Sequence, residues 1–277
     1  MTDERIHRAV SADGTEIAGR VRGQGPPLVL AHPFLLDGDI AWEALVAHLT
    51  DRFTCYLPSL RGRGLSSDNP DHSPPRLMED VIAFIDSIGE PVCLVGWSDS
   101  EQMFGAAGHS DAVVAVAAFE PAVYPLMRED DLAGFGATIE QWTAEAADGR
   151  LDDAARTIHH FVCTDDEFAG LKAGYLERFE ANLPVVMEEH QQSQRYEGPE
   201  STDPEMLGRI TAPVLVLRSQ EGALGTFFAD SAQHITKHVA DAFVRELPDI
   251  GHFAPLVAPE PIAKELISFF ESVRPSA

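Results

Sequence analysis

The chain has few basic residues for its size. Only 20 of its 277 residues are Lys or Arg, against 45 Asp and Glu, and the formal net charge is −25 at pH 7. A surface of this charge repels the phosphates of nucleic acids and the headgroups of anionic lipids. We therefore expect neither nucleic acid nor a membrane as a partner, and a small molecule as the substrate.

The chain also lacks the marks of exported, membrane-spanning and metal-binding proteins. It starts with the polar stretch MTDERIHRAVSADG instead of a secretory signal, and no apolar run reaches the roughly 18 residues of a membrane helix. Its three cysteines, Cys55, Cys93 and Cys163, are scattered and have no metal-ligand spacing. These absences favour a cytoplasmic protein with free thiols and no metal site.

Strand-like and helix-like segments alternate over the first 123 residues. An Asp13-Gly14 pair between two strand-like runs predicts a β-hairpin at the start. Buried parallel strands are predicted from the apolar runs PPLVLAHP, FTCYLPSL, PVCLVGW and AVVAVAAFEP. Amphipathic segments with short links separate these runs, which indicates a parallel sheet with helices on both faces.

The alternation stops over residues 124–208, which are acidic and patterned as helices. The strand signature resumes at APVLVLRSQ, and a helix, the strand and loop AFVRELPDIGHF and a closing helix follow. The predicted fold class is therefore α/β, with a mostly parallel central sheet flanked by helices. Residues 1–123 and 209–277 form the core domain, and residues 124–208 form a helical lid inserted into it.

The segment GWSDS places Ser98 between the strand predicted over PVCLVGW and a helix predicted over SEQMFGAAGHS, residues 100–110. A serine on such a sharp turn projects its hydroxyl, and the backbone N–H groups that follow point towards a common spot. Small residues two positions before and after, here Gly96 and Ser100, let the strand and the helix pass closely. The pattern is typical of a nucleophilic serine, although a helix N-cap serine at a plain turn has the same local sequence.

His252 is the histidine whose position suits a general base. It lies in LPDIGHFAPLVAPEP, between the last predicted strand and the last helix. Loops that follow parallel strands gather at one edge of a sheet, so we expect His252 and Ser98 on the same side.

Together these segments resemble the α/β-hydrolase fold family over nearly the whole chain. The resemblance is carried by PLVLAHPF, RGRGLS, GWSDS, PVLVL and GHFAPLVAPEPIAKELISFF. It implies Ser98 as nucleophile, His252 as general base, and an oxyanion hole made by the backbone N–H groups of Phe34 and Asp99. Pro33 stands where the family usually has glycine, and it removes only an N–H that the hole does not use.

The acid that would orient His252 is the least regular part of the resemblance. The family usually has an aspartate after the strand PVLVL, but the aligned position here is Gly222, beside Glu221. Some branches of the family place the acid after the strand that follows the nucleophile helix, where this chain has Glu120. We therefore predict Glu120 as the triad acid and keep Glu221 as the alternative. A glutamate that caps the first turn of the lid is a further interpretation of Glu120.

Aromatic residues near the turn and in the lid are candidates for the substrate site. Trp97 precedes the nucleophile, a position that often lines the pocket in this family, and Trp142 and Phe161 lie in the lid. A place in the helix core is the alternative for both lid residues. The carboxylate of Asp99 is expected to face away from the site, because a negative charge beside a developing oxyanion would oppose it.

The sequence thus predicts a serine hydrolase of the esterase or lactonase kind. Its substrate would be a small to medium, largely apolar neutral ester or lactone, cleaved through an acyl-enzyme without a cofactor. Two alternatives stay open: the same site could serve C–C bond hydrolysis, cofactor-free oxygenation, perhydrolysis or a cyclase or lyase step, or the chain could bind a ligand without turnover. The oligomeric state is not indicated, and a homodimer is one option.

Overall fold

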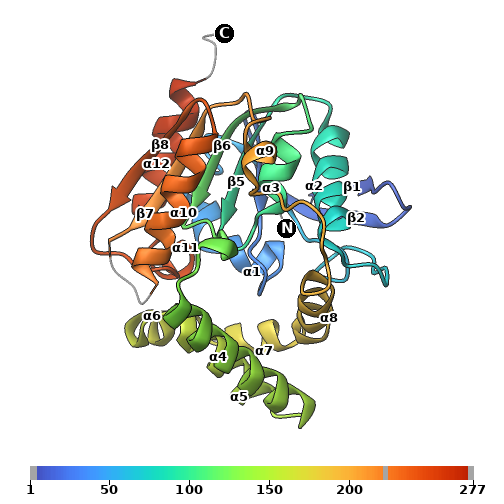
Figure 1. The fold of residues 1–277 in the computed structure, drawn as a ribbon. Coiled ribbons are helices and arrows are strands. Elements are labelled where there is room, and N and C mark those ends of the chain that lie inside the picture. Colours follow the sequence, from blue (N-terminus) through green and yellow to red (C-terminus); the bar gives the residue numbers. More distant parts are fainter. Residues whose placement is uncertain (1–4, 221–223, 274–277) are drawn as a thin grey trace.

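The computed structural model describes residues 5–220 and 224–273 and shows one mostly parallel sheet covered by helices (Figure 1). The sheet has 8 strands in the order β1-β2-β4-β3-β5-β6-β7-β8. The strands are β1 (Arg5–Val10), β2 (Glu16–Gly23), β3 (Pro27–Ala31), β4 (Thr54–Pro58), β5 (Val92–Trp97), β6 (Val113–Phe119), β7 (Val214–Ser219) and β8 (Ala242–Leu247).

The strand directions agree with the sequence prediction. β1 pairs with β2 in antiparallel register, Val10 opposite Glu16, and Gly14 at the turn between them has a positive φ of 91°. β2 is also antiparallel to β4, and the other neighbouring strands run parallel. The carboxyl ends of β3, β5, β6, β7 and β8 therefore meet at one edge of the sheet.

Helices cover both faces of the sheet. One face packs against α1 (Gly38–Trp42), the 3₁₀ helix η1 (Leu45–His48) and α12 (Pro259–Ser272). The other face packs against α2 (Pro74–Ile88), α3 (Gln102–Ala107) and α10 (Gly225–His238). Successive residues of the buried strands alternate between the two cores: Leu28 and Leu30 of β3 face the first, and Val29 and Ala31 the second.

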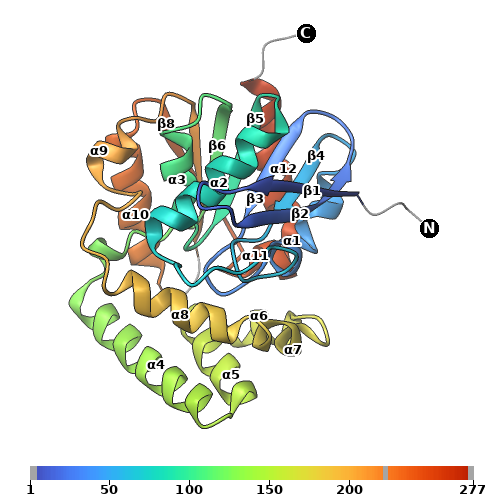
Figure 2. The ribbon, with the colours of Figure 1, turned by 90° about the vertical axis from the view of Figure 1, so that its right-hand side faces the viewer.

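The segment between β6 and β7 is fully described and contains helices and no strand. We call residues 124–208 the helical layer. Its members are η2 (Tyr124–Leu126), α4 (Glu129–Ala147), α5 (Leu151–Val162), α6 (Asp165–Gly170), α7 (Tyr175–Glu180), α8 (Leu183–Ser193) and α9 (Pro204–Leu207). Figures 1 and 2 both show α4 to α8 lying across one end of the sheet, while α9 packs beside α3 and α10.

The end of the sheet that α4 to α8 cover is the edge where the parallel strands finish, so this layer roofs the place where functional loops gather. The short helix α11 (Ala254–Val257) follows β8 at this edge and packs against α6 and α12. Within the described part of the chain, none of the helices combines the length and the apolar character that a bilayer crossing requires.

Candidate active site

Ser98 directly follows β5, on a sharply strained turn. Its φ is 55°, in the left-handed region that residues with a side chain rarely adopt, and its N–H donates to the Phe119 carbonyl at 2.9 Å. A Cβ at Gly96 would lie only 2.3 Å from Ser100 Oγ and 2.2 Å from Met103 Sδ. A side chain at position 96 would therefore force Ser100 and Met103 to shift, which glycine avoids.

The helix after the turn begins later than the sequence predicted. We expected a helix from about Ser100, but α3 starts at Gln102, and the N–H of Met103 donates to the Ser100 carbonyl at 3.0 Å. The Asp99 carbonyl is consequently not used by the helix. It accepts a hydrogen bond from the N–H of Phe34 at 2.9 Å instead.

The structure brings Ser98, His252 and Glu120 into one hydrogen-bonded chain. Ser98 Oγ lies 3.0 Å from His252 Nε2, and His252 Nδ1 lies 2.7 Å from Glu120 Oε2. Glu120 is 1% exposed and His252 4% exposed, so little water competes for either bond. Nδ1–H can donate to the carboxylate while Nε2 accepts the serine proton, which is the tautomer that a general base requires.

Glu120 is held in position by the strand beside it. It follows β6 with a φ of 46°, and its Oε1 accepts hydrogen bonds from Ser219, at the end of β7, through both the N–H at 3.1 Å and the hydroxyl. Oε2 is thereby left for His252. The alternative acid, Glu221, and the neighbouring Gly222 lie outside the described residues.

The loop that carries His252 is fixed by aromatic packing and by the helical layer. The Phe228 ring stacks on the imidazole at a centroid distance of 4.7 Å and an angle of 13°. Glu167 of α6 accepts the N–H of Phe253 at 2.7 Å. The helical layer thus takes part in orienting the histidine.

Of the two N–H groups expected to bind an oxyanion, one is free and one is engaged. The N–H of Asp99 makes no hydrogen bond with any residue that the structure describes, whereas the N–H of Phe34 is bonded to the Asp99 carbonyl. A substrate oxygen at this spot would have to replace that carbonyl in order to use both donors.

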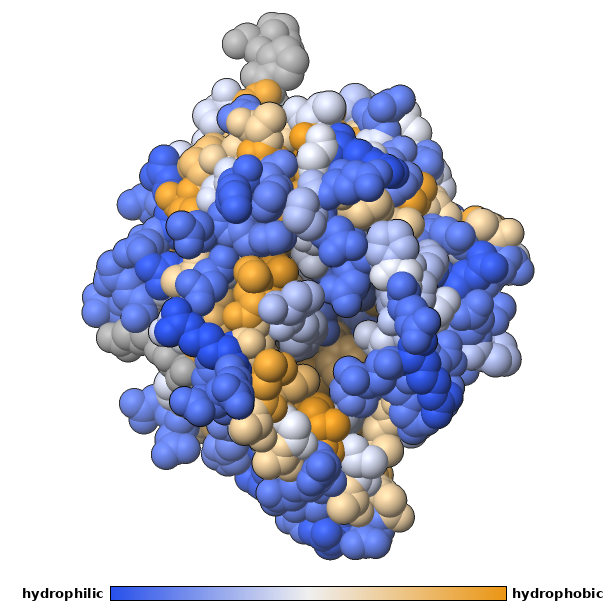
Figure 3. Space-filling model, in the orientation of Figure 1, coloured by the Kyte–Doolittle hydropathy of each residue, from blue (hydrophilic) through white to orange (hydrophobic). Residues whose placement is uncertain are grey.

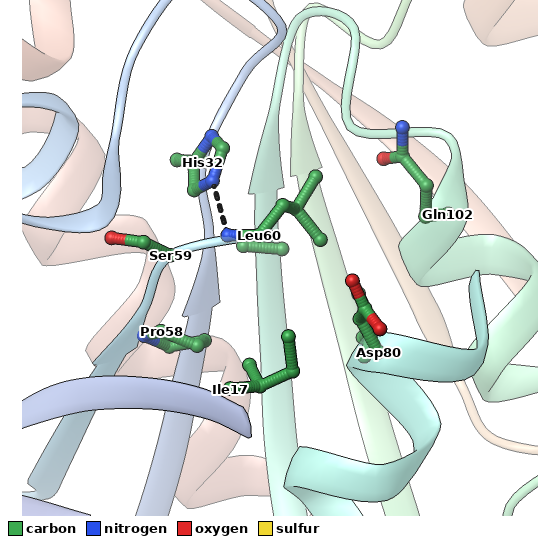
Figure 4. A pocket seen from close by; sticks show the side chains of 9 residues that line it. Ile17, His32, Pro58, Ser59, Leu60, Asp80 and Gln102 are labelled. Carbon is green, nitrogen blue, oxygen red and sulfur yellow. Dashed lines mark hydrogen bonds between the residues drawn. The ribbon is translucent and has the colours of Figure 1, made fainter. Parts of the chain in front are cut away.

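The loop after β3 that carries Phe34 is anchored at both ends. His32 Nε2 accepts the N–H of Leu60 at 3.0 Å, and its Nδ1 lies 2.9 Å from the Pro33 carbonyl (Figure 4). Arg63, fully buried, donates to the Phe34 and Leu36 carbonyls at 2.6 and 3.1 Å. The void beside His32 is only about 10 Å³ and is too small for a ligand.

One cavity adjoins the candidate triad, and a second, larger one shares lining residues with the first. The smaller, about 60 Å³, is lined by Ser98, Trp97, His252 and mostly apolar side chains. The larger, about 490 Å³, opens between the helical layer and the sheet, and Figure 3 shows a hollow there with hydrophobic and hydrophilic residues around it. The residues that line both cavities, and so connect them, are Phe34, Asp99, Tyr124, Phe135 and Ile139.

Carboxylates line the larger cavity. They are Asp99, Glu101, Glu189 and Glu200, and no Lys or Arg is among the lining residues. From the sequence we expected the Asp99 carboxylate to face away from the site, but Asp99 lines it. The carboxylate accepts a hydrogen bond from the Tyr124 hydroxyl at 3.0 Å. Our expectation failed because the late start of α3 leaves no helix N-terminus at Asp99 for the carboxylate to cap.

Burial and crowding perturb these acids. Burial raises the pKa of Asp99 to about 6, against the hydrogen bond from Tyr124. Burial raises the pKa of Glu189 to about 7, against the charge of Arg63, to which Glu189 is paired. The pKa of Glu101 is held well above its usual range, first by burial and then by the charge of Asp99.

Of the three aromatic residues expected to line the substrate site, one lines a cavity and two do not. Trp97 lines the smaller cavity, as expected, but Trp142 and Phe161 line neither of the two cavities. Trp142 is fully buried in the core of the helical layer, and Phe161 packs behind Phe135, with ring centroids 5.4 Å apart. Phe135 of α4 lines both cavities, the place that we expected for Phe161, while α5 reaches the smaller cavity through Ile158 and Val162 instead.

Several side chains of the site carry no signal that the sequence analysis recognised. Ser219 supports Glu120, and Tyr124 and Glu101 line the larger cavity. Ser219 ends a strand that was recognised, so its position at the carboxyl edge was a usable signal. Tyr124 begins the short 3₁₀ helix η2 and Glu101 lies in a turn, and neither segment is long enough for periodicity to give a side-chain direction.

An eight-stranded, mostly parallel sheet with a serine on a strained turn at its carboxyl edge defines the α/β-hydrolase fold class. The chain belongs to this family: the sequence model of the alpha/beta hydrolase family matches residues 28–265. An alpha/beta hydrolase from Sphaerobacter thermophilus DSM 20745 has a similar crystal structure, with a TM-score of 0.71, 27% sequence identity, and coverage of 95% of this chain and 100% of that one.

Two curated relatives are hydrolases. Pimeloyl-[acyl-carrier protein] methyl ester esterase of Stenotrophomonas maltophilia (strain R551-3) is 33% identical over 141 residues, 45% of this chain and 53% of that protein. The aligned part of the chain thus spans about half the length of that esterase. 2-(Acetamidomethylene)succinate hydrolase of Mesorhizobium japonicum is 22% identical over 287 residues, 98% of this chain and 97% of that protein. The family and these relatives support an enzyme with a hydrolase activity.

Proposed function

We propose that the protein is a serine hydrolase that cleaves a carboxylic ester or lactone through an acyl-enzyme. The observation that carries the proposal is the buried chain of hydrogen bonds from Ser98 through His252 to Glu120. The esterase among the relatives supports an ester as the substrate class.

The proposed reaction follows from the positions of these atoms. Ser98 Oγ attacks the carbonyl carbon while His252 Nε2 takes its proton, and Glu120 stabilises the imidazolium that forms. The imidazolium then protonates the leaving alcohol, which departs as the acyl-enzyme forms. Water attacks the acyl-enzyme with His252 as base, releasing the acid and restoring the serine.

The oxyanion of each tetrahedral intermediate would be bound by the N–H of Asp99. The N–H of Phe34 joins it when the substrate oxygen displaces the Asp99 carbonyl. The small, mostly apolar cavity around Ser98 fits the groups next to the scissile bond, and the larger cavity under the helical layer, the proposed lid, takes the rest of the substrate.

One observation favours a second candidate, a protein that binds a ligand in the larger cavity without turnover. In the structure the Phe34 N–H is already paired, so only one of the two expected oxyanion donors is free. Loss of one donor alone costs about 10² to 10³ in rate in other hydrolases.

The test is labelling and turnover at Ser98. The protein is treated with a fluorophosphonate probe and assayed with p-nitrophenyl acetate and butyrate, in parallel with Ser98→Ala and with Ser272→Ala, an exposed serine of α12. We expect labelling and a burst of p-nitrophenol that only Ser98→Ala loses. Turnover that survives Ser98→Ala excludes the acyl-enzyme mechanism, and absence of both labelling and turnover favours the binding protein.

A further inference from the structure

The larger cavity is an unusual place for an acidic wall. Asp99 and Glu101 come from the turn after β5, Glu189 from α8, and Glu200 from the link between α8 and α9. Two parts of the chain that are distant in sequence, the turn after β5 and the segment from α8 to α9, thus bring carboxyl groups to one cavity. Burying charge of one sign is costly unless a partner compensates for it.

Among the residues that the structure describes, only one of these four carboxylates forms an ion pair. Glu189 pairs with Arg63. Glu101 has neither a hydrogen-bond nor an ion-pair partner for its carboxylate among residues 5–220 and 224–273, and the side chain keeps only part of its surface accessible, where it lines the cavity. Glu101 is therefore a partly buried acid without a partner among these residues, and it lines the space that a ligand would fill.

The raised pKa values of these acids show that the cavity lacks a positive charge to balance them. Burial raises the pKa of Asp99 to about 6, against the Tyr124 hydrogen bond and the charge of Arg63. Burial and the neighbouring carboxylates hold the pKa of Glu101 well above its usual range, and burial, then Asp203, raises the pKa of Glu200. His190, which also lines the cavity, does not supply the missing charge, because burial lowers its pKa. A cation placed among these groups would relieve their mutual repulsion.

The remaining walls suit an organic cation. Aromatic rings of Phe34, Tyr124, Phe135 and Tyr196 line the same cavity, and aromatic faces attract alkylammonium groups. A metal ion fits less well: in the described part of the chain no three His, Cys, Asp or Glu side chains come close enough together to hold one. The carboxylates surround a volume of about 490 Å³ instead of converging on a point.

We propose that the larger cavity binds an alkylammonium group, so that the preferred substrates are esters that carry this cation on the part extending from Ser98 under the helical layer. The inference rests on the proposed hydrolase function and changes the substrate expected from the sequence from a neutral to a cationic ester. Glu101 is the residue that determines this specificity, and the carboxylates of Asp99 and Glu200 also attract the bound cation.

The experiment compares esters that differ only in charge. Acetylthiocholine is paired with 3,3-dimethylbutyl thioacetate, and p-nitrophenyl 4-(trimethylammonio)butanoate with p-nitrophenyl 5,5-dimethylhexanoate, because a quaternary nitrogen and a quaternary carbon have nearly the same shape. In at least one pair we expect kcat/KM to be about tenfold higher for the cationic ester. The two pairs place the cation on opposite sides of the scissile bond and so also tell which side occupies the larger cavity.

A matched pair of variants separates the cavity from the overall charge of −25. Glu101→Gln should lower the cationic-to-neutral ratio severalfold. Glu90→Gln removes the same charge from an exposed residue before β5, about 20 Å from the end of that strand, and should leave the ratio unchanged. The preference should also persist in 0.5 M NaCl, which screens long-range attraction but not a contact inside the cavity.

The possible outcomes distinguish failure of the proposed cation site from failure of the proposed hydrolase function. Neutral esters that are hydrolysed as well as cationic ones in both pairs overturn the cation site and leave the hydrolase standing. Equal effects of Glu101→Gln and Glu90→Gln overturn it too, in favour of the general surface charge. If Glu101→Gln does not fold, the test is inhibition of the unaltered protein by tetramethylammonium chloride. We expect stronger inhibition by this salt than by NaCl at the same concentration, and equal inhibition by the two salts overturns the cation site. Failure of all four esters together with absence of Ser98 labelling refutes the hydrolase itself.

Discussion

Replacing Glu120 with glutamine alters one atom of the proposed triad and leaves its shape unchanged. The glutamine oxygen can keep the place of Oε1, which accepts the Ser219 N–H at 3.1 Å and the Ser219 hydroxyl. The amide nitrogen then faces His252 Nδ1, 2.7 Å from the present Oε2. Because an amide nitrogen only donates, Nδ1 must become an acceptor and its proton moves to Nε2, the atom that has to take the proton of Ser98.

The expected loss is large because the site is dry. With Glu120 1% exposed and His252 4% exposed, neither water nor salt replaces the carboxylate as partner of the imidazolium. The corresponding exchange of acid for amide in a serine protease lowers kcat about 10⁴-fold. At 1.36 kcal/mol for each factor of ten, this is about 5 kcal/mol of transition-state stabilisation. The free energy of unfolding should change by less than about 1 kcal/mol, since the bonds from Ser219 persist.

The assay is kcat/KM for p-nitrophenyl butyrate, with urea unfolding as the folding control. Glu221→Gln is the matched variant, because Glu221 is the alternative acid suggested by the sequence and lies outside the described residues. We expect turnover to fall about 10⁴-fold in Glu120→Gln and to stay near the unaltered level in Glu221→Gln. A folded Glu120→Gln variant that keeps more than a tenth of the activity, or a loss confined to Glu221→Gln, would refute the assignment.

Three further predictions concern the cavity and the packing of the site. Burial raises the pKa of Asp99 to about 6 and that of Glu189 to about 7, so both carboxylates lose their charge as the pH falls. The ratio of kcat/KM for the cationic ester to that for the neutral ester should therefore rise severalfold from about pH 5 to about pH 8. A ratio that is independent of pH contradicts this prediction. Gly96→Ala would place a Cβ 2.2 Å from Met103 Sδ and should lower the unfolding free energy by about 2 kcal/mol in urea titration; an unchanged midpoint shows that the turn has room. Arg63→Met leaves the buried Glu189 carboxylate unpaired and should lower the free energy of unfolding by about 3 kcal/mol. The double variant Arg63→Met/Glu189→Met should regain most of this loss. If it does not, Arg63 stabilises the fold chiefly through the backbone carbonyls that it also binds.

The sheet was predictable because its strands carry strong local signals. Buried parallel strands are continuous apolar runs, and residues such as Leu28 and Val29 are buried on both faces, so no alternation with polar residues weakens the pattern. The Asp13-Gly14 pair fixes the register of the first hairpin, because its turn requires a positive φ that Gly14 supplies. The helix α3 was predicted too long: it spans Gln102–Ala107, and the residues on either side of it form turns.

The meeting of Ser98, His252 and Glu120 could also be expected from the sequence. Each follows a strand whose carboxyl end lies at the same edge of the sheet, so topology alone brings the three together. The walls of the cavities could not be predicted in the same way. Trp142 and Phe161 lie on helices whose packing partners are other helices, and which of their faces meets the sheet is decided by tertiary contacts that no local pattern encodes.

The oxyanion hole depends on where the helix after the nucleophile begins. Ser100 stands where the G-x-S-x-G pattern has glycine. Its side chain occupies the space beside Gly96, and the regular helix begins at Gln102. The Asp99 carbonyl, which a helix starting at the nucleophile would use, is left to accept the Phe34 N–H. From the sequence we expected both N–H groups to be available as oxyanion donors. The residue at which a helix begins decides which backbone groups remain unsatisfied, and in this fold those groups are the ones expected to stabilise the transition state.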